Sequence, residues 1–394
     1  MMTWRIGTVL STGKSWRGAR ELDVALDRPL PGRPEGDGPA TVRALAYTDL
    51  VGDPRPGDAV LLNVTALARG LGTGGYALVV GPAARTGADL PPDPAPGPGH
   101  LVKARYTPLQ TMVLGVDEQE SPHHDLLRDA DSLDALPVVV ADLHSALPAV
   151  VAGARHAAAL AGRPAPRVAY VMTDGGALPA AFSRTVATLR DAGWLEVCVT
   201  VGQAFGGDLE AVTVHTGLLA ARHVAGADLA VVAQGPGNLG TGTRWGYSGV
   251  AAGDAVNAAA TLGGQPVASL RVSGADARDR HVGVSHHSLT AYGRVALAAA
   301  DVPVPAPAAD VEALPGWGAP LTSRIAEQAR TLGTEGGGRH HLVDVVADAA
   351  LVATLRTSPA ALRTMGRDLD ADPASFVAAA VAGVHAARLV WSRA

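Results

Sequence analysis

The chain has 394 residues, a formal net charge of −5 and a sequence pI near 6.2, and hydrophobic residues make up 47% of it. This length allows two or three domains, and the mildly acidic balance gives no global basic field, which argues against a nucleic-acid partner. The single cysteine, Cys198, excludes disulfide scaffolds and cysteine-based zinc sites, and it lies in an apolar run that predicts a buried strand. The first residues hold no apolar signal-peptide core, and no apolar run approaches ~18 residues, so we expect a soluble cytoplasmic protein without a membrane span.

Residues 1–85 are predicted to form a small all-β barrel domain. Short runs rich in β-branched residues alternate with clusters of glycine, proline and aspartate, which is typical of strands joined by turns. The predicted strands are 3–10, 21–26, 40–47, 59–64 and 76–80. Residues 86–99 contain five prolines and are predicted to be a semi-rigid linker between domains.

Residues 100–304 are predicted to form a parallel α/β sandwich domain, because apolar runs alternate with alanine-rich helical stretches. The predicted strands are 137–141, 167–173, 195–201, 228–234 and 266–272, and the predicted helices are 147–161, 179–192, 208–224, 249–262 and 288–300. Residues 305–394 are predicted to be a loop and a helical C-terminal extension. Its expected helices are 321–332, 358–366 and 373–392, and the proline-rich stretch 301–320 is expected to loop out. The fold class is therefore α/β, with a small barrel at the N-terminus and a helical extension at the C-terminus.

Polar residues or glycines follow all five predicted strands of the α/β domain. Ligands of open parallel sheets bind outside the carboxyl ends of the strands, so we expect a site at this edge. Asp142 follows the first strand, Asp174 follows the second, and Arg280, His281 and His286 follow the last. We interpret the two aspartates and the two histidines as candidate catalytic acid/base residues, and Arg280 as an anion-binding residue.

A glycine-rich loop follows the fourth predicted strand and contains the pattern G-x-G-x-x-G. Three features argue against a dinucleotide: the loop follows the fourth strand rather than the first, the next helix is expected only near Gly249, and the acid expected about 20 residues further on is missing. The loop also lacks the lysine of a phosphate-binding P-loop. It is interpreted either as a purely structural loop or as one wall of a site for phosphate or carboxylate. Its candidate ligand-binding residues are Gly235, Gly237, Asn238, Gly240, Thr241, Thr243 and Arg244.

The histidines leave three interpretations open: metal ligands, acid/base or anion-binding groups, and ordinary core or surface residues. A divalent metal would be held by His144 together with the Asp and His candidates above, if the topology brings them together. No spacing matches a zinc pattern such as H-E-x-x-H. Adjacent histidines point apart, so at most one member of the pair His286–His287 is expected to face a given site.

The segment 99–127 joins the two predicted domains and carries basic residues. Lys103 and Arg105 stand at alternate positions of an extended run, which places their side chains on the same face. They are interpreted either as part of an interdomain cleft, together with the nearby histidines, or as ordinary surface charges.

Five motifs occur in order along the chain, at 4–11 (WRIGTVLS), 99–110 (GHLVKARYTPLQ), 116–124 (VDEQESPHH), 235–249 (GPGNLGTGTRWGYSG) and 279–291 (DRHVGVSHHSLTA). Together they resemble an uncharacterised bacterial family, widespread in actinobacteria, that is known only as a domain of unknown function. The resemblance covers nearly the whole chain and is weakest after about residue 310. It implies a soluble bacterial protein and supplies no activity, substrate or residue role.

The sequence supports two classes of function. The first is an enzyme that acts on a small anionic ligand, such as a phosphorylated one, at the carboxyl ends of the strands; a divalent-metal-dependent hydrolase that uses the Asp/His set is a variant of it. The second is a non-catalytic ligand-sensing or assembly module. The residues leave open which class applies, the strand order of the sheet and whether the chain forms a homo-oligomer.

Overall fold

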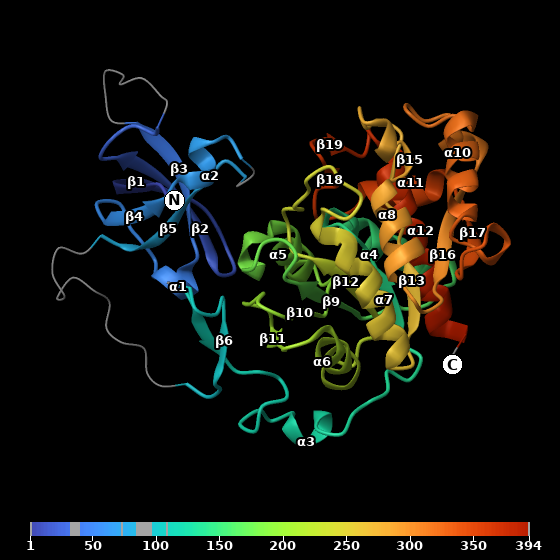
Figure 1. Ribbon diagram of the computed structural model, residues 1–394, viewed down its shortest axis with the longest axis horizontal. Helices are drawn as coiled ribbons and strands as arrows, with labels where there is room; N and C mark the ends of the chain where they lie inside the picture. Colours follow the sequence, from blue (N-terminus) through green and yellow to red (C-terminus); the bar gives the residue numbers. More distant parts are fainter. Residues whose placement is uncertain (1, 32–39, 72–73, 84–96, 108, 393–394) are drawn as a thin grey trace. The chain divides into compact units, whose positions relative to one another are not determined.

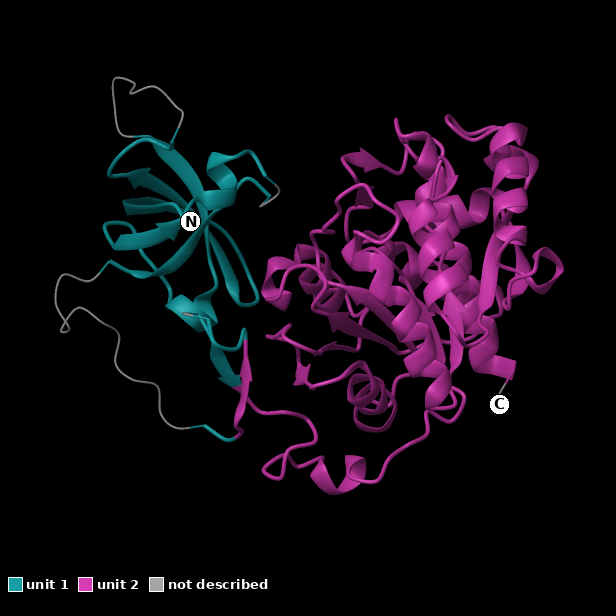
Figure 2. Cartoon of the chain, in the orientation of Figure 1, with its two compact units in different colours: residues 1–98, 104–112 teal, residues 99–103, 113–394 magenta. Residues whose placement is uncertain are grey.

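The computed structural model describes residues 2–31, 40–71, 74–83, 97–107 and 109–392 (Figure 1). The chain divides into two compact units (Figure 2). Unit 1 comprises Met1–Pro98 and Ala104–Met112, and unit 2 comprises Gly99–Lys103 and Val113–Ala394. Most of the linker predicted over 86–99 falls outside the described residues.

Unit 1 contains the closed five-stranded barrel that the sequence predicts. Its strands are β1 (Trp4–Trp16), β2 (Ala19–Leu26), β3 (Thr41–Ala46), β4 (Ala59–Asn63) and β5 (Ala77–Pro82), in the order β1-β2-β3-β5-β4. The β3–β5 pair is parallel and the other pairs are antiparallel. Side chains alternate along β2, which puts Leu22 and Val24 inside the barrel core with Leu62. Two one-turn helices, α1 (Thr48–Val51) and α2 (Thr65–Ala68), follow β3 and β4.

Unit 2 is built on an eight-stranded parallel sheet, which confirms the predicted α/β class. The order is β11-β10-β9-β12-β8-β13-β16-β17, and every pair in it is parallel. Valine and alanine fill its central strands, which are buried on both faces, as expected for strands covered by helices. The strands are β8 (Pro137–Val140), β9 (Val168–Thr173), β10 (Val197–Thr200), β11 (Leu209–Glu210), β12 (Leu229–Gln234), β13 (Gln265–Ala268), β16 (Asp301–Pro307) and β17 (His341–Ala347).

The helices of unit 2 connect and cover these strands. The one that follows β8, α4, packs against the C-terminal helix α12, and α7 packs on α6 and β13. The helices are α3 (His124–Leu127), α4 (Leu147–Leu160), α5 (Arg184–Asp191), α6 (Val214–Leu219), α7 (Ala252–Thr261), α8 (His286–Thr290), α9 (Ala309–Glu312), α10 (Ala319–Arg330), α11 (Ala349–Arg356) and α12 (Pro373–Ser392). Two short strand pairs complete the unit: β14 (Val272–Ser273) with β15 (Gly283–Val284), and β18 (Arg363–Thr364) with β19 (Arg367–Asp368). A third pair joins β6 (Leu101–Lys103) to β7 (Thr111–Val113), and the division between the units runs through these residues.

The proline-rich stretch that was expected to loop out is a strand of the main sheet. Prolines stand at alternate positions of β16, and Ala308, which follows it, donates to the carbonyl of Ala347 at the end of β17. The backbone N–H groups of the even-numbered residues therefore point toward β17. The backbone nitrogens of the prolines, at odd-numbered positions, point toward β13, which pairs with β16 only at Asp301. The N–H group that proline lacks would have no pairing partner on that side, so β16 fits inside the sheet despite its prolines.

The last helix, α12, belongs to the core rather than to a peripheral extension. It lies beside α4 and β16 (red in Figure 1). By length and composition alone α12 is apolar enough to cross a membrane, which the expectation drawn from apolar runs did not foresee. However, 72% of its most apolar window is buried inside the protein, as in a helix that is apolar all round and covered by its own fold.

Candidate functional site

The candidate site lies where the chain changes direction across the sheet. β8 is central, with β12 on one side of it and β13 on the other. From this point β9, β10 and β11 extend toward one edge, whereas β13, β16 and β17 extend toward the other. In open parallel sheets such a switch point leaves a crevice at the carboxyl ends of the strands. Asp142 follows β8 closely, Gln234 ends β12, and residues 269–288 form a lobe after β13.

Three histidine rings meet in this lobe. His281 ends a single 3-10 turn (Asp279–His281), and His286 and His287 open α8, with Ser285 as its N-cap. The ring centroids are 4.9 Å apart for His281–His286, 5.0 Å for His281–His287 and 4.4 Å for His286–His287. One ring nitrogen of each lies within 4.8 Å of one from each of the others. The expectation that only one member of the adjacent pair faces the site is wrong, because both rings project from the first turn of α8 onto His281.

His287 is the most firmly held of the three. Arg271 donates from Nη1 to its Nδ1 at 2.9 Å, and the ring of Tyr247 stacks on it with 3.7 Å between centroids. The Tyr247 hydroxyl also donates to the His287 carbonyl at 2.7 Å. The carboxylate Oδ2 of Asp142 lies 3.8 Å from His287 Nδ1 and 3.9 Å from Arg271 Nη1. Asp142, from β8, therefore meets the lobe that follows β13.

The electrostatics keep all three imidazoles neutral near pH 7. Burial, and then the charge of Arg271, lowers the pKa of His281 to about 4 and that of His287 to about 3. Burial also lowers the pKa of His286, with Arg280 as the next cause. In Asp142 burial raises the carboxyl pKa, and Arg271 opposes that rise. Neutral imidazoles retain a free lone pair, which is the form that accepts a proton or binds a metal.

Four buried polar atoms at this edge have no hydrogen-bond partner among the described residues. They are Asp142 Oδ2, Gln234 Oε1, Ser269 Oγ and His286 Nε2. Buried polar atoms without partners are rare in folded proteins, and each one calls for a water, an ion or a ligand. A small pocket of about 30 Å³ is lined by Asp142, Ser269 and Arg271 among others, and it lies beside the histidines without being lined by them.

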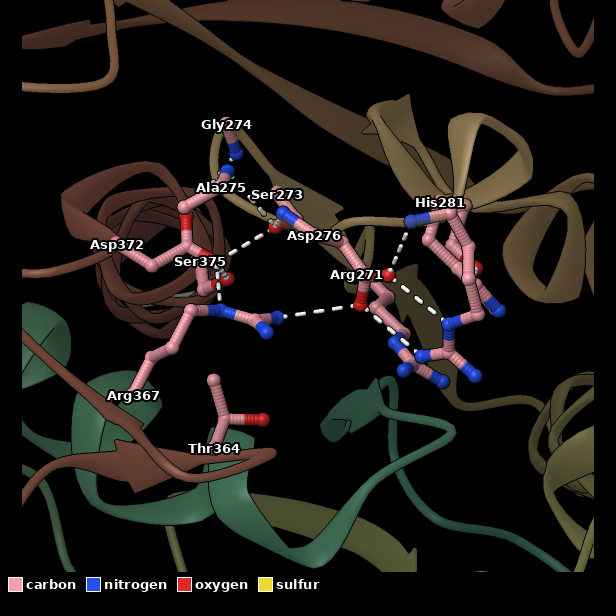
Figure 3. A network of polar contacts seen from close by, with 12 residues as sticks. Arg271, Ser273, Gly274, Ala275, Asp276, His281, Thr364, Arg367, Asp372 and Ser375 are labelled. Carbon is pink, nitrogen blue, oxygen red and sulfur yellow. Dashed lines mark hydrogen bonds and ion pairs between the residues drawn. The ribbon is translucent and has the colours of Figure 1, made fainter.

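A polar network fixes the lobe to the C-terminal segment (Figure 3). Asp372 accepts hydrogen bonds from the Ser273 hydroxyl at 2.6 Å and from Arg367 Nε at 3.0 Å. Arg367 also donates to Asp276 at 3.2 Å, and Arg278 binds the same carboxylate through Nε at 2.9 Å and Nη2 at 3.0 Å. The hydrogen bonds from Arg278 hold the pKa of Asp276 well below its usual range. This network satisfies Arg278 and Arg367, whereas no described carboxylate lies within ion-pair distance of Arg280.

The glycine-rich loop lies beside this lobe. The guanidinium of Arg280 is 3.7 Å from where a β-carbon on Gly242 would stand. The predicted ligand-binding residues of the loop mostly shape the loop itself. The Asn238 side chain accepts from Gln234 at 2.9 Å, and the Thr241 and Thr243 hydroxyls bond each other at 3.2 Å. Gly235 has no room for a β-carbon against Ala177, Gly237 has a φ of 93°, Gly240 bridges to Tyr247, and Arg244 is exposed.

Two candidate residues lie apart from the cluster. Asp174 is exposed after β9 and accepts a hydrogen bond from the Gln203 amide at 2.9 Å. Two strands separate β9 from β13, which is about 14 Å at the usual strand spacing. His144 is buried, with Nδ1 2.9 Å from the Tyr170 hydroxyl and Nε2 2.7 Å from the Ser183 hydroxyl. Both of its ring nitrogens are therefore occupied.

The sequence did not point to several residues of the site, namely Arg271, His287, Tyr247, Gln234 and Ser269. Arg271 and Ser269 fell inside the predicted strand 266–272, but β13 ends at Ala268 and the chain then turns into the lobe. Tyr247 was part of the glycine-rich loop and carried no motif of its own. The signal available for His287 was its position beside His286.

A family model described as a protein of unknown function (DUF3866) matches residues 43–383. The match begins inside the barrel, at β3, and extends through about half of α12. No curated protein and no solved structure matches the chain.

Proposed function

We propose that this chain, which belongs to the DUF3866 family of proteins of unknown function, is an enzyme that acts on a small anionic ligand, such as a phosphorylated one. The ligand would bind at the carboxyl ends of β8, β12 and β13. The observation that carries this proposal is the group of four buried polar atoms without partners at that edge, next to Arg271 and three neutral histidines. A site of this kind is incomplete without a bound group.

The arginines supply the preference for an anion. Arg280 has no described carboxylate partner and borders the glycine-rich loop at Gly242. Arg271 is largely buried and lies between His287 and Asp142 at the base of the site. Guanidinium groups form charge-assisted hydrogen bonds with phosphate and carboxylate oxygens. An anionic ligand that reaches both arginines would therefore form such bonds with each of them.

The histidines favour an enzyme over a sensor. A module that only senses an anion needs cationic and hydrogen-bond donor groups, which the arginines and the loop supply. It does not need three neutral imidazoles, two of them buried and one half-buried, with lone pairs beside a carboxyl group. Lone pairs placed next to an anion-binding arginine suit chemistry on the ligand, and hydrolysis of an ester or anhydride of the anion is the reaction class that fits best. We place this activity in the cytoplasm.

The first test is binding of inorganic phosphate to the full chain by titration calorimetry, with the variant Arg280→Ala. We expect the variant to bind phosphate about 10- to 100-fold more weakly, because it loses a charge-assisted hydrogen bond. Arg330→Ala is the matched control, since Arg330 is exposed at the end of α10 and lies away from the site. Equal phosphate binding by the protein and Arg280→Ala would show that the anion site is elsewhere.

The second test separates an enzyme from a sensor. The protein is incubated with a panel of small phosphomonoesters and phosphoanhydrides, and the release of inorganic phosphate is followed. We expect release from at least one compound, and its loss in the Arg280→Ala variant. A compound that binds in calorimetry and is recovered unchanged from every incubation would favour the ligand-sensing module instead.

A further inference from the structure

We propose that His281, His286 and His287 bind one divalent transition-metal ion, such as zinc, beside the anion site. The inference deepens the proposed function, because it adds the group that acts on the ligand. Its geometric basis is independent of the arginines: three ring nitrogens, one from each histidine, all lie within 4.8 Å of one another. Ligands of a tetrahedral zinc ion with Zn–N bonds of ~2.05 Å stand about 3.4 Å apart, so small side-chain movements are enough to close the set.

The hydrogen bonds of His281 prepare one ligand atom. Its Nδ1 lies 2.7 Å from the hydroxyl oxygen of Ser285, which also accepts from the His287 amide at 3.2 Å. When Nδ1–H donates to that oxygen, the lone pair of His281 is on Nε2. Metal-binding histidines are usually oriented in this way by a hydrogen bond on the other ring nitrogen. Ser285 is thus the positioning residue for His281.

His286 supplies the second and independent observation. Its Nε2 is buried and has no hydrogen-bond partner among the described residues. The ring centroid stands 4.9 Å from that of His281 and 4.4 Å from that of His287, and one ring nitrogen of His286 lies within 4.8 Å of one from each, so the ring belongs to the cluster. A buried imidazole nitrogen without a partner is costly, and a metal ion that takes its lone pair removes that cost.

His287 supplies the third ligand only after its hydrogen bond from Arg271 is broken. Arg271 now donates to His287 Nδ1, and a neutral imidazole that accepts there carries its proton on Nε2. A metal ion on either nitrogen therefore displaces Arg271, whose guanidinium is then free for the anionic ligand. This exchange couples the two sites: metal binding strengthens anion binding, and by linkage the anion strengthens metal binding.

The surrounding charges favour a metal ion bound together with an anionic ligand over a metal ion bound alone. Arg271 donates to His287 at 2.9 Å, and Arg280 stands next to His281 in the chain, so the local potential is positive. A bare divalent cation is disfavoured in that field, whereas a cation that shares the site with a bound anion is balanced. Neutral nitrogen ligands select zinc and related transition metals over magnesium and calcium, which prefer oxygen.

The experiment uses the full chain after treatment with a chelator and dialysis. Zinc alone is titrated by calorimetry, and cobalt(II) alone is added to record the visible absorption of a tetrahedral nitrogen site. We expect one ion per chain, and at least a 100-fold loss of zinc affinity in His281→Gln and in His286→Gln. His215→Gln, at an exposed histidine of α6, is the matched control and is expected to bind zinc as the parent does. Thermal unfolding without metal shows that each variant is folded.

A second variant tests the exchange at Arg271. Arg271→Met is expected to keep zinc binding, because it frees His287, and to lose the gain in phosphate affinity that zinc gives the parent protein. Loss of zinc binding in Arg271→Met would overturn the exchange, and zinc binding by His287→Gln as tight as by the parent would overturn His287 as a ligand. Absence of stoichiometric binding by the parent, or equal binding by His286→Gln, would overturn the metal site.

Phosphate titrations of the chelated protein separate this inference from the proposed function. If phosphate binds through Arg280 and zinc does not bind at all, the metal inference fails and the anion site stands. If zinc binds to the histidines and phosphate binds nowhere near Arg280, the metal site stands and the proposed ligand class fails.

Discussion

At the scale of single residues, the histidines of this chain have opposite roles that their neighbours decide. His144 and His286 both follow strands at the same edge of the sheet. Both ring nitrogens of His144 are within hydrogen-bond distance of hydroxyl groups in the core, whereas His286 keeps a buried nitrogen with no described partner. The first is therefore a structural residue, and the second is a candidate ligand.

The role of His144 makes stability depend on pH. Burial lowers its pKa to about 4, so the folded protein favours the neutral ring. The resulting stabilisation, roughly 3 kcal/mol, is fully present above the ordinary pKa of ~6.5 and is lost as the pH falls from there through 4. Urea unfolding between pH 4 and pH 7 is expected to show this loss in the parent and a shallower slope in His144→Gln. His215→Gln should keep the parental slope; an unchanged slope in His144→Gln would assign the titration to another group.

A buried charge shows the same dependence on neighbours. Lys103 was interpreted as a cleft or surface residue, but it is 2% exposed. Its ammonium donates to the carbonyls of Ala204 at 2.9 Å and Ala211 at 2.8 Å, and lies 3.5 Å from Glu210. The sequence around Lys103 resembles a solvated strand because its partners are about a hundred positions away along the chain.

At the scale of elements, the contact between α4 and α12 depends on two glycines. A β-carbon at Gly153 would overlap the carbonyl of Ala380, and one at Gly383 would overlap the carbonyl of Val150. The two backbones therefore approach each other directly. This close packing explains how α12, which is apolar all round, is covered by a helix and a sheet of the same unit.

The contact predicts that Gly383→Ala destabilises the protein. In an exposed helix this change is stabilising by about 1 kcal/mol, because alanine has the higher helix propensity. Here we expect a loss of about 2–3 kcal/mol in the free energy of unfolding of unit 2, since the two helices must move apart. Gly81→Ala in β5 is the matched control, because nothing lies within 4 Å of a β-carbon there. A Gly383→Ala protein as stable as the parent would show that the helices are not in direct contact.

At the scale of the whole molecule, the two units have separate hydrophobic cores. The barrel core around Leu22 and Leu62 shares no residue with the core of the sheet unit. Domains with independent cores unfold in separate steps, so a single free energy of unfolding does not describe the chain. The candidate site belongs entirely to the sheet unit.

Calorimetric unfolding is therefore expected to resolve two transitions. Phosphate and zinc should each raise the midpoint of the transition of unit 2 alone, because a ligand stabilises the unit that binds it. Leu62→Ala should lower only the midpoint of the other transition, because the cavity it opens in the barrel lowers the free energy of unfolding of unit 1 by about 2–5 kcal/mol. One transition that both changes shift together would show that the two units unfold as one.

The sequence by itself determined the periodic parts of the protein: the barrel strands, the alternation of apolar strands with alanine-rich helices, and the edge at which polar residues gather. These follow from local patterns of two and of three to four residues, which each segment carries on its own. Only the tertiary structure decided three other features. It made β16 a strand, buried α12 and Lys103, and grouped Asp142, but not Asp174, with the lobe histidines. All of them depend on which strand lies next to which, and strand order is set by the packing of the whole sheet.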